Sequence, residues 1–547
     1  MSRAGARWLP FAAILALAVA CYANALQASF QFDDYLHIVD DPAVRRLGPA
    51  LAAAWRSNRG VAALTFALDY ACHGLSAPGY HLVNLVIHAL NGFLIFALGA
   101  RLLSRSGPEG GAASRGGALA GALLFVSHPV QTEAVTYVVQ RQASLATLFY
   151  LLALRLYAEA RHLPRGRLAR LSWLGALASA LLAMRTKEIA FTLPLALCLY
   201  EWVYGAGRPA RRLALLAPFL ATLAVIPLTI LHGQDATAGG VLRVADAASR
   251  VQSALPRWLY FATEARVMVT YLRLLLLPVG QNLDYDYPLQ ASFLSPAVML
   301  SALLLAGLAA LALWCLRRAG QPGQEPLRAV GFGVIFFLLA STVESSVVPI
   351  VDVIMEHRLY LPGAGIFLAA GALSMVAWER LPHSPQWPRR TAVTGLAAAV
   401  ATLSLATYAR NEVWRDGVSL WRDAAAKSPR KARPHLMLGE ALKDQGDLPA
   451  AVREWQLAVA LDPRDSNALN QLGAAALLAG NVSGARAYLD RAVAADGRNA
   501  QAHYNLALAL ERTGDLVRAG AEYQRFLNTA RPALLSTLPV LPPAPGP

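Results

Sequence analysis

Charged residues are scarce in this chain of 547 residues, at 15% of the total against 56% for hydrophobic residues, and the mean hydropathy is +0.40. This balance argues against a soluble globular protein or a disordered one and favours a membrane protein. Cysteine is scarce as well, since Cys21, Cys72, Cys198 and Cys315 lie far apart. Their spacing excludes a disulfide framework and a CxxC metal site.

Acidic residues are outnumbered, because 34 Asp and Glu residues stand against 49 Lys and Arg residues, which gives a formal net charge of +15. In a soluble chain this excess would suggest a nucleic-acid partner. Between Arg410 and Asn528, however, 16 basic residues are matched by 14 acidic ones. Most of the excess therefore lies in short loops between apolar segments. There it indicates membrane topology, and we expect a lipid bilayer and no nucleic acid as partner.

Apolar segments fill the chain up to residue 409. Eleven of them approach the roughly 20 residues that a membrane-spanning helix needs. They are residues 9–26, 80–100, 116–127, 143–160, 171–184, 189–204, 213–231, 294–316, 329–343, 359–378 and 391–408. A further apolar segment, Trp258–Pro278, is interrupted by charges, so we expect it to lie at the membrane interface or to dip in from outside.

The loops between these segments predict the orientation of the chain. The net basic segments are Ser2–Arg7, Arg101–Arg115, Arg155–Arg170, Arg208–Arg212, Arg317–Arg328 and Glu379–Arg390. All of them fall on one side of the membrane under this count, and we assign that side to the cytoplasm. An odd number of spans then places the N-terminus inside and residues 410–547 outside.

A different pattern begins at residue 410, where an amphipathic helical pattern recurs every 34 residues, the period of tetratricopeptide repeats. Gly446, Gly480 and Gly514 mark the same position in successive units. The predicted units are 432–465, 466–499 and 500–533. We therefore expect an all-α protein, with a polytopic membrane domain over 1–409 and a repeat solenoid over 410–530. The Pro-rich tail, 531–547, is predicted to be disordered.

Two adjacent carboxylates, Asp33 and Asp34, follow the first apolar segment at the predicted outer surface of the membrane. A carboxylate beside an apolar surface is partly desolvated, which raises its proton affinity and suits it to take a proton from a hydroxyl nucleophile. A helix cap or a solvated acidic turn would have the same sequence. The pattern alone leaves these interpretations open.

The second predicted span carries a row of polar side chains, His81, Asn84, His88 and Asn91, on an otherwise apolar helix. Their spacing of i, i+3, i+7 and i+10 places them on one helix face. At a rise of about 1.5 Å per residue, Asn91 lies roughly 15 Å deeper in the membrane than His81. Such a row must face a water-filled cavity or other protein, which predicts either a cavity open to the outer side or interhelical hydrogen bonds without a ligand.

Three more polar clusters map to the same outer side. They are His128, Glu133 and Arg141 after the third span, Lys187 between the fifth and sixth, and Glu356 and Arg358 before the tenth. Cations at the interface suit a lipid phosphate or simply extend to the headgroups. We expect Asp284 and Asp286 at the same rim. The convergence predicts an enzyme that uses a membrane-embedded, phosphate-bearing substrate and a polar acceptor from outside.

Several stretches of the chain resemble the transmembrane and tetratricopeptide repeat O-mannosyltransferases, within the GT-C superfamily of glycosyltransferases. They are FQFDD at 30–34, LTFALDY at 64–70, YHLVNLVIHALN at 80–91, FVSHPVQTEAV at 125–135, TKE at 186–188, EHRLYLP at 356–362 and RNEVWRDGVSLW at 410–421. The resemblance covers nearly the whole chain. One departure is Gly60, where the family often has proline, and another is the number of repeats, which is few for grasping an extended polypeptide.

The resemblance implies inverting transfer of a sugar, expected to be mannose, from a polyprenyl-phosphate donor to Ser or Thr hydroxyls of a protein that the repeats recruit. It implies that Asp33 or Asp34 is the general base and leaves the choice between them open. Arg358, with Lys187, would bind the donor phosphate. The residues assigned to the donor and acceptor cavity are His81, Asn84, His88, His128, Glu133, Arg141 and Glu356.

Two other functions remain open at this point: a non-enzymatic, membrane-anchored repeat scaffold for envelope proteins, and a GT-C transferase that acts on a lipid or polysaccharide. The heavy use of Ala, Leu and Arg with short loops predicts a bacterial inner membrane with periplasmic repeats. The alternative is the endoplasmic reticulum membrane with lumenal repeats. No complete metal-ligand set is visible, so no metal site is assigned, although the carboxylates could bind a divalent cation.

Overall fold

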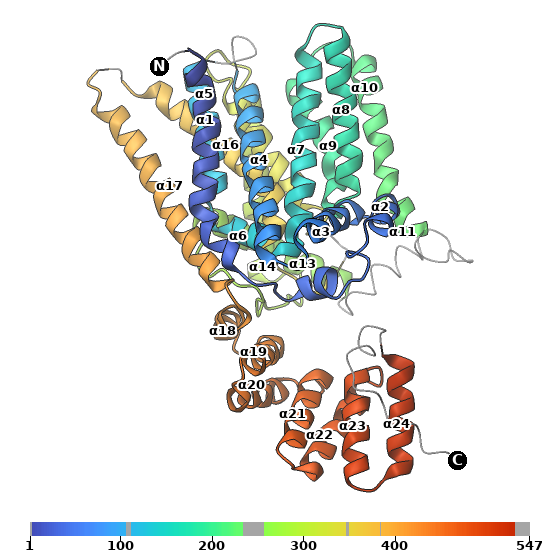
Figure 1. The fold of residues 1–547 in the computed structure, drawn as a ribbon. Helices are drawn as coiled ribbons and strands as arrows, with labels where there is room; N and C mark the ends of the chain where they lie inside the picture. Colours follow the sequence, from blue (N-terminus) through green and yellow to red (C-terminus); the bar gives the residue numbers. More distant parts are fainter. Residues whose placement is uncertain (1–2, 105–110, 233–255, 346–348, 383, 531–547) are drawn as a thin grey trace. The chain divides into compact units, whose positions relative to one another are not determined.

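The computed structural model describes residues 3–104, 111–232, 256–345, 349–382 and 384–530. Regular structure in these ranges is helical throughout, which confirms the all-α class. The chain divides into two compact units (Figure 1). The first, called the membrane unit here, comprises Met1–Gln281 and Tyr287–Arg415. The second, called the repeat unit, comprises Asn282–Asp286 and Asp416–Pro547.

The membrane unit is a bundle of helices. Ten of the eleven predicted segments contain one α-helix each, and the segment 213–231 contains two, α10 and α11. The bundle consists of α1 (Arg3–Tyr22), α4 (Ala77–Leu102), α5 (Ala112–Ser127), α7 (Arg141–His162), α8 (Arg167–Met184), α9 (Leu193–Tyr204), α10 (Pro209–Ala221), α11 (Val225–His232), α14 (Pro296–Arg318), α15 (Leu327–Ser341), α16 (Tyr360–Arg380) and α17 (Trp387–Val413). Among the described residues, eight helices are long and apolar enough to cross a membrane, and α5 and α15 are shorter apolar helices. The chain is therefore an integral membrane protein.

Other helices of this unit are short or more polar. They are α2 (Leu47–Arg56), α3 (Gly60–His73), α6 (Thr132–Thr136) and α13 (Arg257–Leu276). The last of these covers the segment predicted to lie at the interface, and it is not one of the eight candidate spans. Whether it crosses the membrane stays a prediction.

Glycines let three helices of this unit approach one another closely. A Cβ on Gly117 of α5 would lie 2.6 Å from the carbonyl oxygen of Gly371 in α16, and a Cβ on Gly333 of α15 would overlap the carbonyl oxygen of Gly365 in α16. Small residues at such crossings let membrane helices approach closely. The helix α16 is thus packed between α5 and α15, and this packing fixes the position of the residues that precede it.

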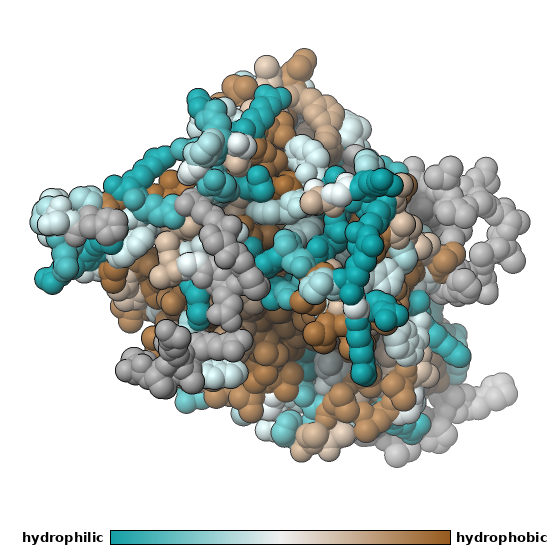
Figure 2. Space-filling view, turned by 90° about the horizontal axis from the view of Figure 1, so that it is seen from above, coloured by the Kyte–Doolittle hydropathy of each residue, from teal (hydrophilic) through white to brown (hydrophobic). Residues whose placement is uncertain are grey.

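Basic loops meet at one end of the membrane unit. Arg161 of α7 and Arg212 of α10 both pair with Glu201 of α9, Arg212 at 3.0 Å. Arg161 also donates a hydrogen bond to the carbonyl oxygen of Ala206 at 2.7 Å. Figure 2 looks onto this end and shows hydrophilic side chains gathered across it. The arrangement agrees with the predicted sharing of one face, and the assignment of that face to the cytoplasm stays a prediction.

The repeat unit consists of one helix followed by three helix pairs. Its helices are α18 (Gly417–Lys427), α19 (Ala432–Asp444), α20 (Leu448–Leu461), α21 (Ser466–Leu478), α22 (Val482–Ala495), α23 (Ala500–Arg512) and α24 (Leu516–Thr529). The three pairs coincide with the three predicted units. The predicted tail, 531–547, lies outside the described residues.

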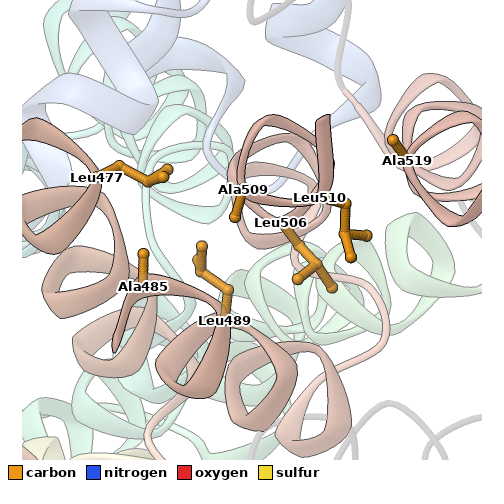
Figure 3. Close-up of a cluster of buried hydrophobic side chains, with 7 residues drawn as sticks. All are labelled: Leu477, Ala485, Leu489, Leu506, Ala509, Leu510 and Ala519. Carbon is orange, nitrogen blue, oxygen red and sulfur yellow. The ribbon is translucent and has the colours of Figure 1, made fainter. Parts of the chain in front are cut away.

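The 34-residue period appears in the turn inside each pair. Gly446, Gly480 and Gly514 have φ angles of 90°, 74° and 80°, a left-handed conformation that favours glycine. The residue after each glycine caps the next helix, as when Asp515 accepts from the N–H of Arg518 at 3.3 Å. Leucines and alanines then fill the space between the helices. Figure 3 shows one such cluster: Leu477, Ala485, Leu489, Leu506, Ala509, Leu510 and Ala519.

Candidate functional site

The acidic pair lies in a strained turn after α1. The N–H of Asp34 closes this turn by donating to the carbonyl oxygen of Gln31 at 2.8 Å. Phe32, inside the turn, has a φ of +43°, a conformation that costs a non-glycine residue about 1–3 kcal/mol. Such strain persists only where the surroundings fix the backbone. Here it sets the direction of the two carboxylates that follow.

The two aspartates have different surroundings. Asp34 is 1% exposed, and its carboxylate oxygens accept from the N–H groups of Gln31 at 2.9 Å and Val139 at 2.7 Å. Burial raises the pKa of Asp34 to about 7, although these backbone donors favour its charged form. Asp33 is half-buried, and its N–H donates to the hydroxyl of Tyr137 at 2.8 Å. Asp34 thus anchors the turn, whereas the side chain of Asp33 is more accessible.

Tyr137 connects the acidic turn to the last membrane helix. Its ring packs against Trp414 with the ring centres 5.2 Å apart. The neighbouring Thr136 donates to Oδ1 of Asn411 at 2.8 Å, and the amide of Asn411 donates to the carbonyl oxygen of Cys21 at 2.9 Å. The segment after α5 is therefore held between the ends of α1 and α17, beside the acidic pair.

Glu133 and His357 form the centre of the site. Oε1 of Glu133 lies 2.7 Å from Nδ1 of His357, and its Oε2 accepts from the N–H of His357 at 3.1 Å. Both residues are buried. Burial raises the pKa of Glu133 above its usual range, against the effect of the backbone N–H groups of residues 357 and 356. The pair joins the segment after α5 to the short helix η7 (Glu356–Leu359), which carries Arg358.

A second group of charges surrounds Arg358. Lys187 pairs with Glu344 at 3.2 Å, and both side chains are largely buried. Arg358 donates to the carbonyl oxygens of Asp352 at 2.7 Å and Val353 at 3.1 Å. Burial alone would raise the pKa of Glu344, but the charges of Lys187 and Arg358 hold it below its usual value. The two cations expected to bind a phosphate therefore lie around one carboxylate.

One further member of this group was not predicted from the sequence. Glu264 lies in α13 and is 1% exposed. Burial raises its pKa to about 7, and the charge of Arg358 is the largest effect in the opposite direction. In the same helix the hydroxyl of Tyr271 donates to the carbonyl oxygen of Met355 at 2.9 Å. The sequence feature that could have identified Glu264 is its position inside an apolar segment, because an acidic residue there is usually paired or functional.

The polar row of α4 is occupied by hydrogen bonds between helices, and its members are at most 2% exposed. His81 Nε2 lies 3.0 Å from the carbonyl oxygen of Ala28, and His88 Nδ1 lies 2.7 Å from the hydroxyl of Tyr360. The amide of Asn84 donates to the carbonyl oxygen of Val135 at 3.0 Å, and the amide of Asn91 donates to that of Ser144 at 2.9 Å. These contacts fit the second of the two interpretations. They favour a packing role for His81, Asn84 and His88 over the lining of a cavity.

Arg141 is also held by protein groups. Its Nη1 lies 2.6 Å from Oδ2 of Asp69, its Nε donates to Oδ1 of Asn84 at 2.6 Å, and its Nη2 donates to the carbonyl oxygen of Tyr80 at 2.9 Å. The arginine side chain is fully buried. It attaches α3, through Asp69, to α4 and α7. These contacts favour a structural role for Arg141 over the expected place in a substrate cavity.

His128 and Glu356 lie beside the Glu133 pair. His128 Nδ1 accepts from the N–H of Val130 at 3.2 Å, and burial lowers the pKa of His128 to about 4, so the ring is neutral near pH 7. Glu356 accepts from the amide of Gln281 at 2.6 Å, and the same amide donates to the carbonyl oxygen of residue 129 at 3.0 Å. Both expected residues therefore border the site.

Asp284 and Asp286, expected at the rim of the site, belong to the repeat unit, and their place at that rim stays a prediction. Asp284 pairs with Lys431 and Arg433 of the repeat unit. Asp286 lies 3.3 Å from Nε of Arg430. Their charges attach a five-residue segment of the chain to the start of the repeats. The basic residues after α18, which balance these carboxylates, were the signal for this pairing.

The contacts link four distant parts of the sequence at one end of the membrane unit: 31–34, 133–139, 187 and, in the last part, residues 344 and 352–358. This arrangement provides a half-buried carboxylate that can take a proton, and two cations that can stabilise negative charge on a leaving group. Within the residues that the structure describes, no group of three or more His, Cys, Asp and Glu side chains is arranged to hold a metal ion.

Comparisons with known proteins bear on the repeats and on the whole chain. Residues 404–467, 436–499 and 470–533 match the family described as the tetratricopeptide repeat. Protein O-mannosyl-transferase TMTC3 of Mus musculus is 27% identical over 480 residues, which cover 80% of this chain and 50% of the relative. Protein O-mannosyl-transferase Tmtc3 of Drosophila melanogaster is 28% identical over 510 residues, which cover 81% of this chain and 54% of the relative.

This chain is a homologue of the transmembrane and tetratricopeptide repeat O-mannosyltransferases. The resemblance stated from the sequence is thereby confirmed. The chain spans about half the length of these curated relatives. Among solved structures, ArnT from Cupriavidus metallidurans bound to undecaprenyl phosphate aligns with a TM-score of 0.36 and 16% identity, covering 91% of this chain and 81% of ArnT.

Proposed function

We propose that this O-mannosyltransferase homologue transfers a sugar, mannose in the first instance, from a polyprenyl-phosphate donor to Ser or Thr hydroxyls of a protein. The observation that supports this function most is the joining of four sequence segments into one buried group of ionisable side chains. Ionisable residues in a membrane protein are costly to bury, and where they gather they mark functional sites. The names of the mouse and Drosophila relatives support the sugar and the class of acceptor.

Asp33 is the general base in this proposal. An alcohol is a weak nucleophile, so a positioned carboxylate that takes its proton accelerates transfer by about 10²- to 10⁴-fold. The half-buried side chain of Asp33 can reach a hydroxyl, whereas both oxygens of Asp34 accept backbone N–H groups. Asp34 is therefore a positioning residue that fixes the turn. The acceptor oxygen attacks the sugar carbon as the bond to the donor phosphate breaks, and the sugar configuration inverts.

Arg358 and Lys187 stabilise the departing phosphate in this proposal. A guanidinium group matches phosphate geometry, and preorganised cations at the point where charge develops are among the largest contributions to catalysis. Glu344 pairs with Lys187 at 3.2 Å, so an incoming phosphate competes with this carboxylate for the lysine. The competition makes binding of the donor reversible, because Glu344 holds the cation after the lipid phosphate leaves.

The repeats recruit the protein acceptor in this proposal, on the side of the membrane away from the basic loops. Stacked tetratricopeptide repeats form extended surfaces of the kind that bind polypeptides. A bacterial inner membrane with periplasmic repeats is the expected location. A related transferase with a lipid or polysaccharide acceptor would use the same base and the same cations, so the acceptor must be tested separately.

Transfer of radiolabelled mannose tests the proposal. Membranes containing the full chain are incubated with labelled polyprenyl-phosphate mannose and a Ser- and Thr-rich peptide, and label is measured in the peptide, lipid and polysaccharide fractions. We expect label in the peptide for the wild type and for Asp40→Asn, an exposed carboxylate of the same segment. We expect a loss of at least 100-fold for the Asp33→Asn/Asp34→Asn double variant.

Other outcomes would decide between the alternatives. Label in the lipid or polysaccharide fraction would assign the acceptor differently and leave the base in place. Equal labelling by the wild type and the double variant would contradict the assignment of the base. No transfer by the wild type with any polyprenyl-phosphate sugar would favour the scaffold.

A further inference from the structure

A cavity of about 630 Å³ lies between the end of α16 and the start of α17, away from the proposed active site. Its lining residues are Trp378, Gln386, Arg389, Arg390, Val393 and Thr394. The volume is in the range of about 300–1,000 Å³ that is usual for small-molecule sites. The cavity includes the end of the basic segment Glu379–Arg390, so it lies at the basic end of the membrane unit.

The first half of α17 leaves one side of this cavity open. The buried residues of this helix are Thr407, Arg410 and Asn411, all in its last two turns. Val393, which lines the cavity, is 57% exposed. Figure 1 shows the start of α17 diverging from α1. Since α17 is long and apolar enough to span a membrane, its exposed half faces lipid, and the open side of the cavity faces lipid too.

The charged side chains that line the cavity are both arginines, and contacts with neighbouring residues hold them in place. The guanidinium carbon of Arg389 lies 4.9 Å from the ring centre of Trp378, and the same group donates to the carbonyl oxygen of Leu381 at 3.4 Å. Arg390 donates to the side-chain oxygen of Gln386 at 3.3 Å. A tryptophan and two arginines at the end of a membrane helix are typical of the headgroup region of a bilayer.

We propose that this cavity binds the phosphate headgroup of an anionic glycerophospholipid from the leaflet at the basic end of the membrane unit. Guanidinium groups bind phosphate through paired hydrogen bonds. The exposed apolar side of α17 lies beside the acyl chains. Basic pockets between membrane helices are a general form of lipid headgroup site. The lipid fills the space between α16 and α17 and stabilises the position of α17 relative to α16.

This lipid site is separate from the proposed transfer of a sugar. Along α17, 21 residues separate Arg390 from Asn411. Asn411 accepts a hydrogen bond from Thr136, at the end of the unit that carries Asp33 and Asp34. At about 1.5 Å per residue the two positions are roughly 30 Å apart. A phosphate bound at Arg390 therefore cannot take part in chemistry at Asp33, and either proposal can fail without the other.

Retention of labelled phosphatidylglycerol by the purified full chain tests this site. The chain is placed in nanodiscs of phosphatidylcholine that contain a small fraction of labelled phosphatidylglycerol, and the apparent affinity is measured. Each arginine near a headgroup is worth about a fivefold change in affinity. We expect Arg389→Gln/Arg390→Gln to weaken retention about 25-fold. The matched control is Arg165→Gln/Arg167→Gln, which removes two exposed arginines from the same basic end.

A second variant separates shape from charge. Val393→Trp fills the cavity without changing its charge, and we expect it to weaken retention at least tenfold while the protein stays monodisperse and unfolds at the wild-type temperature. Equal losses in the two arginine double variants would overturn the proposal, because they would show a diffuse attraction to the whole face. Full displacement by millimolar inorganic phosphate would also overturn it, since the ligand would then be the free anion and not a lipid.

Discussion

Replacing Asp33 and Asp34 one at a time separates a base from a positioning residue. The half-buried Asp33 has more access to an acceptor, so Asp33→Asn removes the proton acceptor and little packing. We expect kcat for sugar transfer to fall about 10²- to 10⁴-fold, which corresponds to roughly 3–5 kcal/mol in the activation free energy. The free energy of unfolding should change by less than about 1 kcal/mol.

Asp34→Asn should behave differently because both carboxylate oxygens accept backbone N–H groups, from Gln31 at 2.9 Å and from Val139 at 2.7 Å. Asparagine has one carbonyl oxygen, so one buried N–H faces an amide NH₂ and loses its acceptor. Such a loss costs about 1–3 kcal/mol. We expect a lower unfolding temperature together with lower activity, as the turn that carries Asp33 moves.

The assay combines initial rates at saturating donor and acceptor with thermal unfolding in the same detergent. Asp40→Asn is the control for removing one negative charge from this segment. Two results would refute the reasoning. In the first, Asp33→Asn keeps more than a tenth of the wild-type kcat. In the second, Asp34→Asn loses activity at an unchanged unfolding temperature, which would make Asp34 the base.

Four further predictions concern charge and backbone geometry. Burial raises the pKa of Asp34 to about 7, so the folded state binds more protons than the unfolded state between about pH 4 and pH 7. The free energy of unfolding should therefore fall as pH rises through this window. Thermal unfolding across pH measures this fall, which should be less steep in Asp34→Asn. Arg141→Gln should lower the free energy of unfolding by about 3–5 kcal/mol because it leaves a buried carboxylate unpaired, and denaturant titration would contradict this with a change below 1 kcal/mol. Arg358→Gln should lower kcat at least tenfold, and a change in the KM for the acceptor alone would refute its role at the donor. Gly480→Ala, at a φ of 74°, should destabilise the repeats by about 1 kcal/mol, whereas Gly520→Ala in the helix α24 should not.

Periodicity predicted the parts of this fold that repeat or that span a fixed length. The positions of Gly446, Gly480 and Gly514 predicted three helix pairs, because each glycine has to adopt a positive φ between the helices of a pair. The apolar segments predicted the membrane helices, because the bilayer sets their length. The span count placed Lys187 and Arg358 on the same side of the membrane, whereas the two carboxylates near Arg358, Glu344 and Glu264, were not predicted.

Tertiary pairing could not be predicted from the sequence. Arg141 was assigned to a substrate cavity, and only the structure shows its partner, Asp69, on a helix more than 60 residues earlier. Asp284 was expected near the membrane site, but its charge pairs with Lys431, almost 150 residues later in the chain. A charged residue inside an apolar segment indicates that an opposite charge must pair with it. The sequence does not show which residue carries that opposite charge.

The choice between Asp33 and Asp34 also required the structure. Adjacent carboxylates in a sequence are equivalent until the backbone assigns them directions. The positive φ of Phe32 and the N–H of Val139 make that assignment, and neither has a signature in the local pattern. These are long-range effects, since residue 139 lies more than 100 positions away.

The configuration of the sugar in the product tests the central claim most directly. Wild-type chain in liposomes is supplied with polyprenyl-phosphate mannose of defined anomeric configuration and a Ser- and Thr-containing peptide, and the glycopeptide is analysed by NMR. Direct attack of a hydroxyl activated by Asp33, with the phosphate leaving toward Arg358, predicts mannose on a Ser or Thr oxygen with inverted configuration. Retained configuration, or the absence of glycopeptide from wild-type chain, would contradict the account.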